Sequence, residues 1–216
     1  GTIHAASVLV FGNRQDAYDM AKRIHSFHGT VRGQHEGVSY HANDAEAQTW
    51  VLAAVFQGAA EAKRRWHPPA FTPEEEESLY GDYRVFGEFF GINRDLLPST
   101  MEELKGYWED RLNGNKLLQT RTSRELTREI FRFKAPRLLL PAGKVSQSIS
   151  IMSLDPRLLE KSGLQPTASD RRISAGVDYM MRNTYGHLPG IMRTQTIPTY
   201  MAAQRTAASI IKKVTP

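Results

Sequence analysis

The chain has 216 residues, of which 40% are hydrophobic, and a formal net charge of +5. This is the size of one large domain with a substantial core, which excludes an intrinsically disordered chain. Because there is no cysteine, disulfides, thiolate metal sites and cysteine nucleophiles are excluded as well.

The positive charge permits binding to nucleic acid or to anionic lipid. Neither an aromatic RNA-binding signature nor a zinc-finger spacing accompanies it, so we expect no nucleic acid partner. No apolar run reaches the roughly 18 residues that span a bilayer, and no signal-like start is visible. We therefore expect no integral membrane span and favour a soluble, cytoplasmic protein. The sequence indicates no particular oligomeric state.

Two helices are predicted at the start of the chain. An apolar helical segment over residues 2–11 ends at Gly12 and Asn13. A second helix continues to Gly33, and apolar residues with one histidine recur along it at spacings of three and four, which is typical of one side of an amphipathic helix. The residues on this side are Ala17, Met20, Ala21, Ile24, Phe27, His28 and Val31.

The two histidines of this helix should lie in different environments. His28 belongs to the apolar side, whereas His25 falls near Tyr18, Lys22 and Arg32 on the polar side. A buried imidazole needs a partner for each nitrogen, because an unpaired one costs about 1–3 kcal/mol. That partner is a carbonyl, a carboxylate or a metal, and the sequence of the helix alone leaves these alternatives open.

Helix signals continue through the middle of the chain. We expect a loop over residues 34–41 and then three helices, each with a start and a stop signal. The first starts at Asn43 or Asp44 and runs to Trp66, before Pro68 and Pro69. The second starts at Thr72, which forms a capping box with Glu75 and is followed by Pro73 at the first helical position, and it ends at Gly91. The third starts at Ser99 or Thr100 and ends near Leu112, before Gly114.

The last third of the chain is also predicted to be helical. We expect helices over residues 123–133, 156–161, 169–183 and 198–213, while residues 146–154 alternate in a strand-like way and are ambiguous. The sequence therefore predicts a single all-α domain over residues 1–216. It has a core part, 1–143, and a C-terminal helical part, 144–216, that meet near Gly143.

The helix over residues 45–66 is rich in small residues, which let another helix or a flat ligand approach its backbone. These small residues are Ala53, Ala54, Gly58, Ala59, Ala60 and Ala62, and Trp50, Val51 and Phe56 supply bulk beside them. Tight packing against a neighbouring helix explains the same composition, so both interpretations stay open.

Several short motifs resemble a known family in order and spacing. An apolar run ending F-G is followed by H-x-x-V-x-G, then by Y-x-A-x-D before a Trp-Val pair, and then by an acidic helix leading to Leu-Pro. The matching residues are Phe11, Gly12, His28, Val31, Gly33, Tyr40, Ala42, Asp44, Trp50, Val51, Gly91, Leu97, Pro98, Glu103 and Leu104. Over about residues 2–112 the chain resembles the MpaB-type oxygenases, which share their core domain with the latex-clearing proteins, the rubber oxygenases.

This resemblance implies an all-α fold that holds a non-covalent haem b in a pocket between core helices. The histidine of H-x-x-V-x-G, here His28, would be the proximal iron ligand, and Phe11, Trp50, Val51 and Ala54 would form walls of the pocket. Thr2 stands where the family has a threonine. It would hydrogen-bond oxygen or a haem propionate, or else cap its own helix.

The implied function is that of a haem-dependent oxygenase acting on a small apolar organic substrate with dioxygen. Gly1 and Leu52 stand where relatives carry a lysine and a histidine, so the resemblance implies no specific substrate. The alternative is a non-catalytic helical binding module of the same fold, which holds a lipid-like or other apolar ligand.

Overall fold

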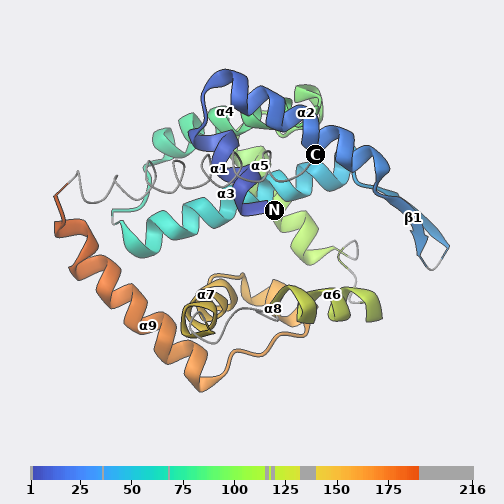
Figure 1. Cartoon of the computed structure of the whole chain (residues 1–216). Helices are drawn as coiled ribbons and strands as arrows, with labels where there is room; N and C mark the ends of the chain where they lie inside the picture. The colour runs from blue at the N-terminus through green and yellow to red at the C-terminus, as the bar shows by residue number, and fades with distance from the viewer. Residues whose placement is uncertain are drawn as a thin grey trace, which may run out of the picture. The chain divides into compact units, whose positions relative to one another are not determined.

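The computed structural model describes residues 2–35, 37–67, 69–114, 117, 120–131 and 140–189 (Figure 1). The described chain is almost entirely helical, which confirms the predicted all-α class. Its α-helices are α1 (Thr2–Phe11), α2 (Arg14–Thr30), α3 (Ala45–Trp66), α4 (Pro73–Phe89), α5 (Met101–Asn113), α6 (Arg121–Phe131), α7 (Leu140–Met152), α8 (Pro156–Ser162) and α9 (Ala168–Asn183). Two 3₁₀ turns, η1 (Arg94–Leu96) and η3 (Tyr185–His187), and two strands, β1 (Arg32–His35) and β2 (Val38–His41), complete the order of described elements.

The chain divides into two compact units. Unit 1 consists of Gly1–Leu52, Asp82–Leu97 and His187–Pro216, and unit 2 of Ala53–Gly81 and Pro98–Gly186. Helices α3 and α4 each pass from one unit to the other. Gly143 lies inside α7, while the division of the chain into domains stays a prediction.

Helix starts follow the predicted caps because each cap satisfies a free backbone N–H of the first turn. Asp44, one of the two predicted caps, accepts from the backbone N–H of Ala47 at the start of α3. Asn13, expected only to end the preceding helix, accepts from the backbone N–H of Asp16 and caps α2. Thr72 begins α4 with the predicted capping box: its hydroxyl accepts from the Glu75 N–H, and the Glu75 carboxylate accepts from the Thr72 N–H.

The expected loop over residues 34–41 is wrong, because the chain forms a β-hairpin here. β1 pairs antiparallel with β2 in the register Arg32 to His41, with Gly33 opposite Tyr40. Gly37, at φ 82°, provides the left-handed residue in the turn. Periodicity missed the hairpin because β1 contains no apolar residue and the alternation in β2 covers only four residues. A Cβ at Gly33 would lie 2.7 Å from the Tyr40 hydroxyl, so a larger residue there would displace the Tyr40 ring.

Two further expectations concern the last third of the chain. The ambiguous residues 146–154 are helical through Met152, as part of α7, and bury Ser148 and Ile151 one turn apart. The strand-like alternation was therefore misleading. The helix predicted over 198–213 lies outside the described residues.

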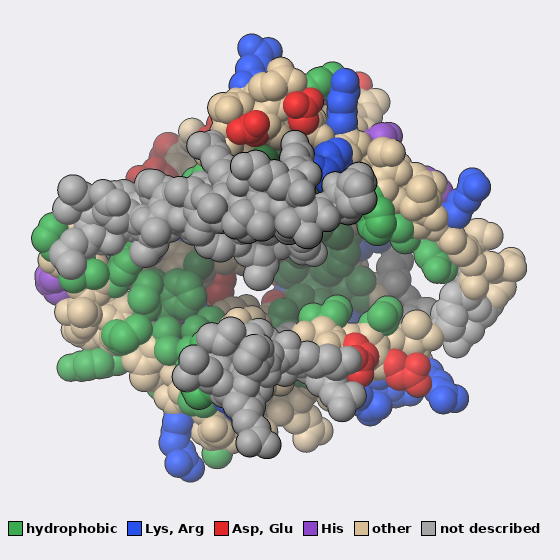
Figure 2. All heavy atoms as spheres, in the orientation of Figure 1, with side chains coloured by type: hydrophobic (Ala, Val, Ile, Leu, Met, Phe, Trp, Pro, Cys, Tyr) green, Lys and Arg blue, Asp and Glu red, His purple; other side chains and the backbone are tan. Residues whose placement is uncertain are grey.

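Each unit has its own buried core. In unit 1, Leu52, Ile92 and Leu97 pack together, with partly buried aromatic rings of α4 and its C-terminal turn against them. In unit 2, the Phe56 and Tyr80 rings meet edge to face with centroids 5.6 Å apart, and the Tyr80 hydroxyl donates to the Pro98 carbonyl at 2.8 Å. On the face shown in Figure 2, Lys and Arg side chains lie among acidic ones rather than in one basic patch.

Candidate functional site

His28 lies in the last turn of α2, on the buried side of that helix. The side chains of Ala17 and Ala21, which share its helical face, are only 8% and 2% exposed. His28 is half-buried and His25 is exposed, so the predicted difference between the two histidines is confirmed. The predicted apolar side of α2 is not buried at its C-terminal end, where Phe27 is 66% and Val31 37% exposed.

The Nδ1 atom of His28 is buried and has no hydrogen-bond partner among the described residues. The Phe27 ring lies at a centroid distance of 6.4 Å from the His28 ring and is tilted by 51°. A buried nitrogen without a partner costs about 1–3 kcal/mol, and native proteins retain few such groups. This imidazole therefore has an unsatisfied capacity to bind a ligand.

The end of α2 is held in place within unit 1, which fixes the backbone that carries His28. The Val31 N–H donates to the His28 carbonyl at 3.0 Å, and the Ala42 N–H donates to the Val31 carbonyl at 2.9 Å. The Asn43 side-chain amide donates to the His25 carbonyl at 3.2 Å. The segment between β2 and α3 thus holds the end of α2 through backbone carbonyls on both sides of His28.

The other predicted site residues do not gather around His28 in one described cavity. Phe11 is 53% exposed at the end of α1, and Val51 is 58% exposed on α3. Trp50 and Ala54 are half-buried one turn apart on α3, and Ala54 belongs to unit 2. Thr2 is the first residue of α1, but its side chain lies outside the description. These assignments stay predictions.

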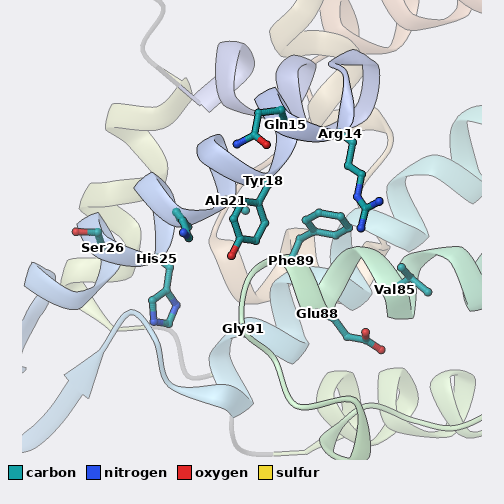
Figure 3. A pocket seen from close by; sticks show the side chains of 11 residues that line it. Arg14, Gln15, Tyr18, Ala21, His25, Ser26, Val85, Glu88, Phe89 and Gly91 are labelled. Atoms are coloured by element: carbon teal, nitrogen blue, oxygen red, sulfur yellow. The ribbon is translucent and has the colours of Figure 1, made fainter.

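A groove of about 960 Å³ lies in unit 1 along α2 and the end of α4, beside His25 rather than His28 (Figure 3). It contains none of the predicted site residues. Its lining residues are Arg14, Gln15, Tyr18, Ala21, Lys22, His25, Ser26, Val85, Glu88, Phe89 and Gly91.

The side of this groove that α2 forms is visible in the sequence, but it was not recognised there as part of a groove. Tyr18, Lys22 and His25 share one helical face, and this spacing was interpreted as a solvent-facing polar side. The other half comes from Val85 and Phe89, which are remote in sequence. Only the fold brings the two halves together.

Within the described ranges, no three His, Asp or Glu side chains are placed to hold a metal ion. Also within these ranges, every helix is too short or too polar to cross a bilayer.

Comparison with known proteins gives one family and no individual relative. No curated protein and no solved structure matches the chain. Residues 1–208 match the family described as ER-bound oxygenase mpaB/B'/Rubber oxygenase, catalytic domain. Because this match spans nearly the whole chain, the protein belongs to the family of MpaB and rubber oxygenase catalytic domains.

Proposed function

We propose that this oxygenase-family domain binds haem b through His28 and acts on a small apolar organic substrate with dioxygen. The observation that supports this proposal is the buried His28 Nδ1, which has no partner among the described residues. Family membership supports the broader oxygenase function.

The residues present fit a haem. A haem iron takes four nitrogen ligands from its own macrocycle, so one protein imidazole is enough to hold it. In a chain without cysteine, a histidine nitrogen would be a suitable donor to the iron. Bound haem supplies the dioxygen and one-electron chemistry that amino acid side chains lack.

The chain's own part is to hold and shield the group. His28 would bind the iron from a helix end that the segment between β2 and α3 keeps in place. A ligand that bonds Nδ1 would remove the cost of leaving this atom unpaired. Phe11, Trp50, Val51 and Ala54 would supply apolar contact, which is favourable by about 25 cal/mol per Å² buried. Thr2 is proposed as a hydrogen-bond donor to oxygen or to a propionate.

Substitution of each histidine of α2 tests the assignment of the ligand. We expect the purified domain supplied with haem to show a Soret band, and His28→Ala to lose the band or to shift it and weaken haem binding at least tenfold. His25→Ala is the matched control, because it removes an exposed imidazole three positions away on the same helix. Circular dichroism checks that both variants fold.

Two outcomes would contradict the proposal. If His28→Ala keeps an unchanged Soret band, His28 is not the iron ligand. If the folded full-length protein shows no Soret band with haem, the alternative of a non-catalytic module that holds an apolar ligand takes its place.

A further inference from the structure

The groove along α2 exposes large apolar side chains on both of its walls. Tyr18 is 48% exposed on α2, and Val85 and Phe89 are 45% and 38% exposed on α4. In Figure 3 the Tyr18 side chain comes from α2 and the Phe89 side chain from α4, and both line the groove. Covering such surface is favourable by about 25 cal/mol per Å², so the groove suits a ligand with an apolar body.

Two cations that line the groove have no carboxylate counter-charge among the described residues. Arg14 and Lys22 line it, and neither forms an ion pair with a described residue. The Lys22 ammonium lies 4.6 Å from the centre of the Tyr18 ring, which keeps it beside the apolar wall. The one carboxylate among the lining residues, Glu88, already pairs with Arg94 at 3.4 Å. The groove therefore has an unbalanced positive charge.

The spacing of the groove's polar groups favours an elongated ligand. Arg14 and His25 lie three turns apart on α2, which is about 16 Å along a helix axis. At the His25 end, the ring Nδ1 lies 3.4 Å from the Phe90 carbonyl oxygen. Gly91 has a positive φ of 80°, and its backbone passes close to the His25 ring. A Cβ at this position would lie 3.2 Å from the His25 Nδ1. The apolar walls lie between these two ends.

We propose that this groove is a second ligand site, which binds a small elongated amphipathic anion of the long-chain carboxylate class. The carboxylate pairs with Lys22 or Arg14, and the hydrocarbon chain lies against Tyr18, Val85 and Phe89. A charged hydrogen bond to the ligand supplies orientation, and the apolar walls supply most of the affinity.

Fluorescence of dansyl-labelled undecanoate measures binding to the full chain. We expect saturable binding that dodecanoate competes away and that dodecyltrimethylammonium, with the same chain and the opposite charge, does not. Lys22→Gln should weaken binding about fivefold, the usual effect of losing one charged hydrogen bond at a partly exposed site. Phe89→Ala should weaken it about tenfold through lost apolar contact.

Arg23→Gln is the matched control for charge, because Arg23 is the exposed neighbour of Lys22 and lies outside the groove. We expect it to leave the affinity unchanged. Equal weakening by Arg23→Gln and Lys22→Gln, or equal competition by the cationic detergent, would overturn the proposal. His28→Ala should retain the binding, which separates this site from the proposed haem ligand.

Discussion

The environment of a single side chain decides what it can do, as His25 and His28 show. They lie three positions apart on α2, yet His25 is exposed and His28 is half-buried with an unsatisfied nitrogen. Water forms the hydrogen bonds of an exposed imidazole, whereas the nitrogens of a buried imidazole need a protein atom or a ligand as partner. The proposed haem ligand follows from this difference.

Asp170 is a buried carboxylate that accepts several hydrogen bonds. It is 2% exposed and accepts from the Lys144 ammonium at 2.7 Å and from the Ser148 hydroxyl at 2.7 Å. It also accepts from the N–H and hydroxyl of Thr167, closing a capping box at the start of α9. These bonds connect α7 to α9 within unit 2.

Burial by itself would raise the pKa of Asp170, but the bonds from Lys144, Thr167 and Ser148 outweigh it and hold this pKa well below its ordinary range. A carboxyl whose pKa is lower in the folded state stabilises the fold above its unfolded pKa of about 3.9. This contribution is lost as the pH falls from that value towards the folded pKa.

We therefore expect Asp170→Asn to lower the free energy of unfolding by about 2–4 kcal/mol at neutral pH. The variant should also lose less stability than the wild type on acidification below about pH 5. Urea unfolding at a series of pH values measures both effects. Asp82→Asn, at an exposed position, is the control and should change little; an equal loss in both variants would contradict the role of Asp170.

At the scale of elements, capping side chains determine where helices begin. The capping box of Thr72 and Glu75 satisfies two backbone N–H groups at the start of α4, and α4 supplies one wall of the groove. Loss of a threonine cap typically costs about 1 kcal/mol.

We expect Thr72→Ala to lower the free energy of unfolding by about 1 kcal/mol. Ser78→Ala, at an exposed position inside the same helix, should be neutral or slightly stabilising, because alanine is the better helix former. Urea unfolding followed by circular dichroism compares the two. If Ser78→Ala costs as much as Thr72→Ala, the cap is not the cause.

At the scale of the whole molecule, unit 2 is tied together by a buried arginine. Arg65 of α3 is 6% exposed, and its guanidinium donates to the Asp178 carboxylate at 2.7 and 2.8 Å and to the Ser174 hydroxyl at 2.6 Å. Trp66 donates to the same carboxylate at 2.8 Å. Burial alone would raise the pKa of Asp178, but the bonds from Arg65 and Trp66 lower it overall.

We expect Asp178→Asn to lower the free energy of unfolding by about 3–5 kcal/mol, because it leaves the Arg65 charge buried without its counter-ion. Replacing both partners, as in Arg65→Met with Asp178→Leu, should cost less than the sum of the single replacements. A double-mutant cycle of urea unfolding measures this coupling. Additive losses would show that the ion pair is not a unit.

The amino-acid sequence by itself determined the helices and most of their boundaries. Asp44, Thr72 and Thr100 cap helices where they were expected to do so, because a cap bonds to a backbone N–H only two or three residues away. Three further predictions also depend only on the order of residues along the chain. They are the helical class, the contrast between His25 and His28, and the family resemblance. The hairpin of β1 and β2 escaped prediction because backbone pairing, rather than apolar alternation, forms it.

Only the tertiary structure decided which distant side chains meet. Arg65 and Asp178 are 113 positions apart, and Tyr18 and Phe89 face the same groove from different helices. Periodicity predicts which face of a helix is apolar, but it does not say which other element covers that face. The unsatisfied nitrogen of His28 is likewise a tertiary fact, since a hydrogen-bond partner can come from any part of a folded chain.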